Sequence, residues 1–248
     1  MTEMCGGKKE SVDVSSYKYI ASCVLSKNYP DISASALDYV EKRGIQIMRC
    51  CVPDYKVKEF EDVMQPSIAD RWKSYPYYIP YKEGDTIVSA CHNCTNIFSE
   101  VHPDVDVISI YELIARDENF VYPDYHGREM TLQDCWRAKD HDEEKKAVRE
   151  LLRRMNIKVV EMEDDEDFCG ISLLRPQPAR NPKMAPLHYG PEQTAGKFGT
   201  YTPEEQAAIM REHGKKIPTD EVVCYCHYCL EGLRLSGKKS FHILELLF

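Results

Sequence analysis

The chain lacks any long apolar run. No stretch of about 18 apolar residues occurs in its 248 residues, so we expect no membrane-spanning helix. The segment from Met1 to Ser16 is polar and has no apolar core of the kind that signal peptides carry. We therefore expect a cytoplasmic protein, in which cysteine thiols stay reduced.

Positive charge is also scarce. The chain has 32 Lys and Arg against 41 Asp and Glu, and its formal net charge is −9. Binding to nucleic acid needs clustered basic side chains, so we expect no nucleic-acid partner. No Gly-x-Gly-x-x-Gly motif follows a predicted strand, so nothing predicts a site for flavin or nicotinamide.

Cysteine, by contrast, is abundant, with 11 residues. An eight-residue stretch that begins with two β-branched residues and ends in Cys-His-x-Cys occurs twice, over 87–94 and 222–229. One Cys-x-x-Cys is a weak signal, because such motifs serve both redox and metal sites. Two copies with the same lead-in predict a duplicated module.

The segments around each copy repeat in the same order. The first half reads as a strand over 19–23, a helix that ends at Gly44, and a strand over 45–48. The second half reads as a strand over 130–134, a helix that ends at Asn156, and a strand over 157–160. Gly and Asn both adopt the left-handed conformation that ends helices. Downstream, 108–114 parallels 241–247.

These patterns predict an α/β fold. We expect two similar lobes related by pseudo-two-fold symmetry, each a small, mainly parallel sheet flanked by helices. The expected boundaries are a flexible tail over 1–16, a first lobe over 17–122 and a second lobe over 123–248. Residues 174–200 are rich in Pro and Gly and predict a long loop. Metal sites should lie at the strand ends and face one another between the lobes.

The repeat sorts ten of the cysteines into two sets. The first comprises Cys23, Cys50, Cys51, Cys91 and Cys94, and the second comprises Cys135, Cys169, Cys226 and Cys229, with Cys224 close by. Thiolates are soft anions that suit zinc and iron–sulfur clusters. Four can close a tetrahedral zinc site or hold a four-iron cluster. A fifth thiol in the first set exceeds what one tetrahedral ion uses, which favours iron–sulfur there.

A histidine lies inside each Cys-x-x-Cys motif, at His92 and His227. A catalytic interpretation makes each a proton donor to a leaving thiolate, because histidine titrates near neutral pH. A second interpretation makes each a hydrogen-bonding neighbour that tunes the metal site.

The order Cys, then Cys-Cys or Cys-Gly, then Cys-x-x-Cys, present twice, resembles the cysteine-rich (CCG) domain family. That family includes the heterodisulfide reductase subunit in which two such motifs hold noncubane clusters. The resemblance extends from about residue 17 to Phe248. Two positions depart from the family motif: Val52 stands where the first motif has Gly, and Phe168 where the second has its first Cys.

The resemblance implies an iron–sulfur redox subunit, a disulfide oxidoreductase. It would reduce or form a small-molecule or protein disulfide at noncubane [4Fe-4S] clusters. The first set would hold one cluster and the second set the other. Electrons would come from a ferredoxin-like iron–sulfur subunit. The altered second motif leaves an alternative, in which a non-catalytic electron-transfer subunit carries one cluster and one structural zinc or cubane site.

Overall fold

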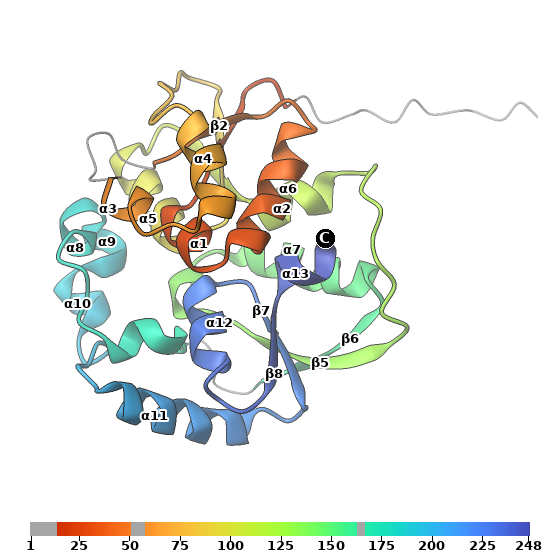
Figure 1. Ribbon diagram of the computed structural model, residues 1–248, viewed down its shortest axis with the longest axis vertical. Helices are drawn as coiled ribbons and strands as arrows, with labels where there is room; N and C mark the ends of the chain where they lie inside the picture. Colours follow the sequence, from red (N-terminus) through yellow and green to blue (C-terminus); the bar gives the residue numbers. More distant parts are fainter. Residues whose placement is uncertain (1–13, 51–57, 163–166) are drawn as a thin grey trace, which may run out of the picture.

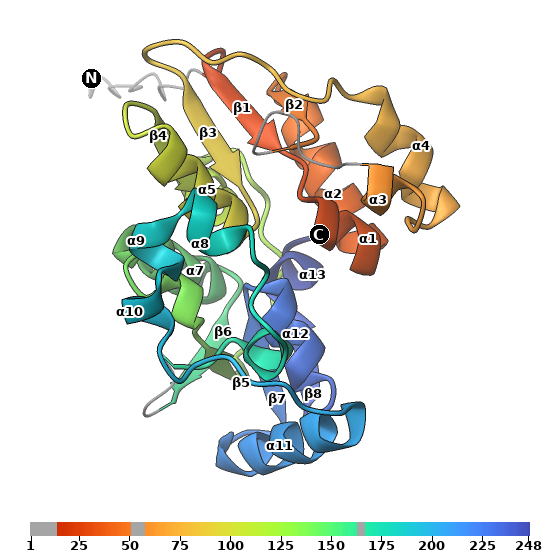
Figure 2. The same ribbon diagram turned by 90° about the vertical axis from the view of Figure 1, so that its left-hand side faces the viewer.

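The computed structural model describes residues 14–50, 58–162 and 167–248. The strands form two four-stranded sheets, in the orders β2-β1-β3-β4 and β6-β5-β7-β8, and every pairing is parallel. The strands are β1 (Tyr17–Ile20), β2 (Gln46–Met48), β3 (Thr86–Ser89), β4 (Asp106–Ser109), β5 (Arg128–Gln133), β6 (Ile157–Glu161), β7 (Glu221–Cys224) and β8 (Lys239–His242). The identical order confirms the predicted α/β fold with two similar lobes (Figure 2).

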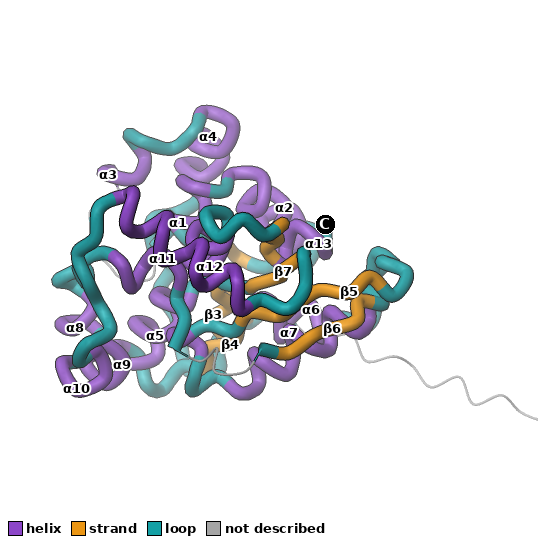
Figure 3. Tube along the Cα trace, turned by 90° about the horizontal axis from the view of Figure 1, so that it is seen from below, coloured by secondary structure: helices purple, strands orange, loops and turns teal. Residues whose placement is uncertain are grey.

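Helices surround both sheets (Figures 1 and 3). In the first half they are α1 (Cys23–Asn28), α2 (Pro30–Glu41), α3 (Lys58–Glu61), α4 (Pro66–Ser74), α5 (His92–Val101) and α6 (Ile110–Arg116). In the second half the α-helices are α7 (Asp142–Arg154), α8 (Asn181–Met184), α9 (Pro186–Tyr189), α10 (Pro191–Thr194), α11 (Pro203–Lys216), α12 (His227–Leu233) and α13 (Ile243–Leu247). Two short 3-10 helices, η1 (Trp136–Ala138) and η2 (Gly170–Leu174), precede α7 and α8. No helix of the described residues is long and apolar enough to span a membrane.

The two halves pack on each other reciprocally. Helix α6 of the first half contacts α7 of the second, and α13 of the second contacts α2 of the first. Since α6 corresponds to α13 and α2 to α7, the two contacts are equivalent, as pseudo-two-fold symmetry requires. One apolar cluster runs through both halves. The boundary at 122/123 itself stays a prediction.

Local signals explain where several helices begin and end. Gly44 (φ 71°) and Asn156 (φ 55°) both adopt the left-handed conformation, as their positions after α2 and α7 predict. Capping boxes begin α6 at Ser109 and α13 at His242, so the parallel between 108–114 and 241–247 is structural.

The prediction of a long loop over 174–200 is wrong. The segment contains the short helices α8, α9 and α10, each with a proline at its first or second position. Proline has a fixed φ that suits the first turn of a helix, and its missing N–H costs nothing there. Several of the prolines in this segment therefore indicate helix starts.

Candidate metal centre

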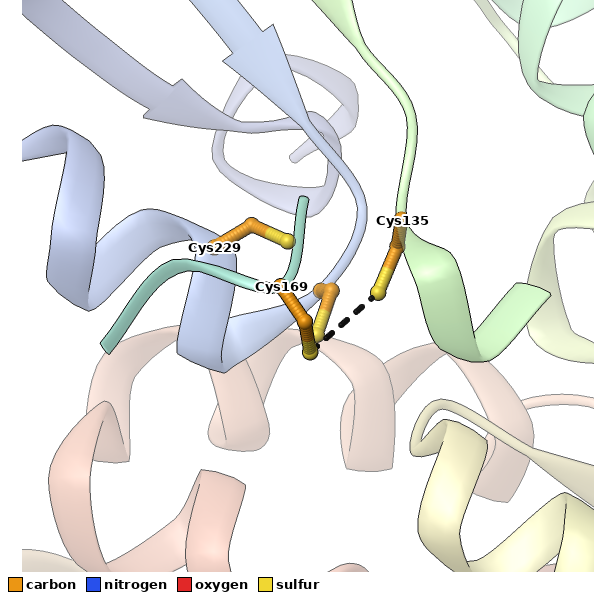
Figure 4. Close-up of side chains that lie close together, drawn as sticks. Cys135, Cys169 and Cys229 are labelled. Atoms are coloured by element: carbon orange, nitrogen blue, oxygen red, sulfur yellow. Dashed lines mark hydrogen bonds between the residues drawn. The ribbon is translucent and has the colours of Figure 1, made fainter. Parts of the chain in front are cut away.

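The four cysteines of the second set lie together. The Sγ atoms of Cys135, Cys169, Cys226 and Cys229 are all within 4.8 Å of one another, and all four residues are buried. The Sγ atoms of Cys135 and Cys169 are 3.6 Å apart (Figure 4). Four sulfurs around one zinc ion, at about 2.3 Å each, would be roughly 3.8 Å apart. The group could therefore hold a metal ion with little rearrangement.

Parallel strands bring these thiols to one edge. Cys135 follows β5, Cys169 follows β6 after a longer segment, and Cys226 follows β7. The carboxyl ends of parallel strands meet at the same edge of a sheet, where sites in such folds gather. Cys229 lies one turn into α12, so the Cys-x-x-Cys motif contributes two sulfurs from one helix start.

The turn at Cys169-Gly170 requires its glycine. Gly170 has φ +51°, and a Cβ there would lie 2.1 Å from the carbonyl oxygen of Tyr228, within the Cys-x-x-Cys motif. Any side chain would push this turn away from the start of α12. On the other side of the turn, the backbone N–H of Trp136 donates to the backbone carbonyl of Phe168 at 2.7 Å. These contacts fix Cys169 beside the other three thiols.

One thiol of the group ionises most readily. Burial opposes ionisation of Cys226, but hydrogen bonds from Cys135, Cys169, Cys229 and His92 hold the pKa of Cys226 well below its ordinary value. Burial raises the pKa of Cys229 and Cys135 well above theirs. Of these three thiols, Cys226 is the one whose ionised form its surroundings favour. A bound cation would replace the remaining protons.

The first set is arranged more loosely. Cys23, Cys50, Cys91 and Cys94 line one small cavity, of about 20 Å³, together with Arg49, Asn93 and Arg180. Cys23 is partly exposed and the other three are buried, while Cys51 lies outside the described residues. Within the described ranges, only the second-lobe thiols form a close group of three or more metal-binding side chains. The pKa of Cys91 falls to about 5, chiefly through a hydrogen bond with Cys94.

Each motif histidine lies against the other lobe. His92 is 4% exposed, and its Nε2 lies 3.2 Å from Glu144, while its Nδ1 has no hydrogen-bond partner among the described residues. Its ring packs edge-on against Tyr225, directly before Cys226, with 5.5 Å between the ring centroids. Burial lowers the pKa of His92, but the nearby Glu144 and Cys226 raise it well above its ordinary value. His227 is 2% exposed, helps to lower the pKa of Cys91, and has no hydrogen-bond partner for either ring nitrogen among the described residues. The two cysteine groups are therefore neighbours.

Cys224 lies apart from the four-thiol group. It is buried within β7, and its thiol donates to the carbonyl oxygens of Phe241 at 3.6 Å and Cys226 at 3.7 Å. Burial raises its pKa well above the ordinary value. The structure thus gives Cys224 backbone partners and keeps it out of the group.

Sequence reasoning missed one residue of this region. Arg137 is 3% exposed and lies between the two cysteine groups. A single arginine two positions after a cysteine carries no recognisable pattern, so nothing in the sequence separates it from a surface residue.

No protein-family model, curated protein or solved structure matches this chain. The resemblance to the CCG family therefore stays a prediction from the cysteine pattern.

Proposed function

We propose that this protein is a metal–thiolate redox protein of the iron–sulfur class, which reduces or forms a disulfide. The proposal rests on the positions of the two motif histidines, each of which lies next to the opposite lobe. His92 of the first motif contacts Glu144 and packs against Tyr225, directly before Cys226, in the second lobe. The buried His227 of the second motif acts electrostatically on Cys91 of the first. A buried histidine next to thiols of the opposite lobe provides a proton donor where two sulfur groups meet.

The proposed reaction is R–S–S–R′ + 2 electrons + 2 protons → RSH + R′SH. The S–S bond breaks, and each sulfur gains one electron and one proton. A bound iron–sulfur cluster would pass electrons singly, and a ferredoxin-like iron–sulfur partner would supply them. His92 and His227 would each deliver a proton to a departing thiolate. The substrate would be a small-molecule or protein disulfide.

The two cysteine groups suit different tasks. The second-lobe group is closed, with four buried thiols. The first-lobe group lines a cavity and includes the partly exposed Cys23. We therefore assign substrate contact to the first-lobe group. Its thiols suit a soft metal, and a noncubane [4Fe-4S] cluster would use Cys51 as well. A cluster larger than one ion would need the described thiols to move apart, because the cavity is small.

A second candidate function is electron transfer without disulfide chemistry. The spacing of the second-lobe sulfurs favours it, because all lie within 4.8 Å of one another, close to the roughly 3.8 Å expected around one zinc ion. In that protein the second lobe would hold a structural zinc or a cubane cluster, and the first lobe would hold the single working cluster.

Metal content decides between these candidates. The protein would be purified strictly anaerobically, with iron, sulfide and zinc quantified on one sample and electron paramagnetic resonance recorded before and after oxidation. About eight iron and eight sulfide per chain would support two clusters. About four iron with one zinc would favour electron transfer. Zinc without iron would contradict both redox functions.

Activity would be tested by thiol release from a disulfide under a one-electron donor. We expect His92→Gln and His227→Gln to slow turnover by roughly 10²–10⁴-fold while metal content is retained. His126→Gln is the matched control, because the side chain of His126 is 85% exposed. Unchanged turnover in both motif variants would remove the proton-donor role.

A further inference from the structure

Arg137 joins the turns that carry the cysteines. It lies in η1, two residues after Cys135. Its Nη1 donates to Oδ1 of Asn93 at 2.7 Å, and its Nη2 donates to Oγ of Ser172 at 2.7 Å. Asn93 stands inside the Cys-x-x-Cys motif of the first lobe, and Ser172 follows Cys169 in η2. One guanidinium thus contacts cysteine-bearing turns of both lobes.

Aromatic rings enclose the same guanidinium. Its carbon lies between 5.0 and 5.9 Å from the centroids of the rings of Trp136, Tyr189, Phe198 and Tyr228. Tyr228 belongs to the second Cys-x-x-Cys motif, and the Tyr189 hydroxyl donates to Asn93 at 2.8 Å. The faces of these rings attract the guanidinium. The rings have no net charge, however, so they do not neutralise its positive charge.

Within the described part of the chain, this cation has no carboxylate partner. Among the ion pairs of the described residues, none includes Arg137, and its Nε lies buried without a hydrogen-bond partner. A buried charge is costly unless an opposite charge compensates it. Among the described residues, the acidic groups on the turns that Arg137 joins are the thiols of Cys135, two residues before it, and of Cys169, three residues before its partner Ser172.

A loaded metal centre would supply that negative charge. Four thiolates carry four negative charges, and a divalent ion adds two positive charges, so the centre would carry a net charge of −2. Such a buried anion also needs compensation. The guanidinium and the centre would each remove the other's electrostatic cost.

We propose that Arg137 is the buried counter-cation of the metal–thiolate centre in the second lobe, linked through Asn93 to the Cys91–Cys94 turn of the first. The role belongs to one lobe, because the position two residues after Cys23 is Leu25, a buried apolar residue. It requires a metal in the second-lobe group, but it does not depend on disulfide chemistry.

The first test measures metal affinity. In the full-length chain with Cys23, Cys50, Cys51, Cys91 and Cys94 all replaced by Ser, cobalt(II) and zinc(II) would be titrated anaerobically against a chromophoric chelator, so that the second-lobe group alone is measured. We expect Arg137→Met to weaken binding by roughly 10–100-fold, the usual effect of losing a residue that supports metal ligands. Arg175→Met is the control, because its side chain is 46% exposed and pairs with Glu231. Equal affinity in the Arg137→Met and unsubstituted chains would overturn the proposal.

The second test separates charge from packing. Asn93→Asp keeps the acceptor for Arg137 but gives the guanidinium a carboxylate partner, which competes with the thiolates. We expect this first-lobe substitution to weaken metal binding in the second lobe by about 10-fold or more. A purely structural arginine would bond the carboxylate more strongly and leave metal affinity unchanged, which would overturn the proposal.

A conservative variant completes the comparison. Arg137→Lys keeps the charge and loses the planar fork, so we expect it to recover most of the affinity that Arg137→Met loses. If Arg137→Met does not fold, Asn93→Asp and Arg137→Lys still decide the question. Failure of the unsubstituted chain to bind cobalt or zinc would overturn the metal centre itself, whereas binding that ignores all these variants would overturn the role of Arg137 alone.

Discussion

The two lobes share one sheet order but hold their cysteines differently. In the second lobe four buried thiols form a closed group, and in the first the described thiols line a cavity with one of them partly exposed. The same strand ends therefore support two kinds of site. In the second lobe the close fit of Gly170 against α12 holds Cys169 beside the other thiols; the sequence has Val52 at the matching position of the first lobe. A duplicated framework can keep its sheets while each copy specialises.

The largest expected effect comes from Gly170→Ala. The added Cβ would meet the Tyr228 carbonyl at 2.1 Å and would also occupy a left-handed backbone conformation. We expect a loss of more than about 4 kcal/mol in the free energy of unfolding, together with loss of second-lobe metal. Urea unfolding and metal analysis would measure both.

Gly44→Ala is the control variant, because it tests the left-handed conformation without a close neighbour. Gly44 also has a positive φ, +71°, but no atom of the described residues lies within 4 Å of a Cβ built there. We expect a cost of only about 1–2 kcal/mol, from the left-handed conformation alone. Similar costs for the two glycine variants would contradict the close fit of the Cys169-Gly170 turn.

The next prediction compares the loss of one cysteine from the closed second-lobe group with the loss of one from the more exposed first-lobe group. Metal binding by a closed group contributes directly to folding stability, so we expect Cys226→Ser to release second-lobe metal and to lower the thermal midpoint by several degrees. Cys23→Ser, at the more exposed first-lobe thiol, should change the midpoint less. Anaerobic calorimetry with metal analysis would show this, and the reverse order of midpoints would make the first lobe the structural site.

A smaller effect concerns the paired capping boxes. Ser109 begins α6 and accepts from the Glu112 N–H, while His242 occupies the matching position before α13. We expect Ser109→Ala to cost about 1 kcal/mol, the usual value for a lost N-cap. Chemical denaturation would measure it. A change within experimental error would mean that solvent or the neighbouring backbone replaces this cap.

A separate effect, measured as a slope against pH, is the titration of His213 in the second lobe. His213 contacts Gln133 at 2.7 Å and stacks on Phe168, and burial lowers its pKa from 6.5 to about 4. The unfolded chain therefore takes up the proton first as the pH falls. The stability that His213 contributes is complete above pH 6.5 and is lost as the pH falls toward about 4.

Unfolding measured between pH 7 and pH 4 would show this slope, and His213→Gln should reduce it, because glutamine does not titrate. An unchanged slope would assign the acid sensitivity to another group, such as His242, whose pKa burial lowers to about 3.

The sequence alone predicted the sheets and the members of the second-lobe group. Both depend on local signals: runs of β-branched residues form strands, Cys135, Cys169 and Cys226 each follow a strand, and the Cys-x-x-Cys spacing adds Cys229. The helix ends at Gly44 and Asn156 were predictable for the same reason, because a left-handed residue after an apolar helix is a local property.

Tertiary structure alone determined which side chains meet between the lobes. The contact of His92 with Glu144 and the bond of Arg137 to Asn93 depend on how α6 packs on α7 and α13 on α2. Sequence spacing places a residue at a strand end or on a helix, but it does not give its direction across an interface. That direction follows from the packing of the whole core, and many side chains together determine this packing.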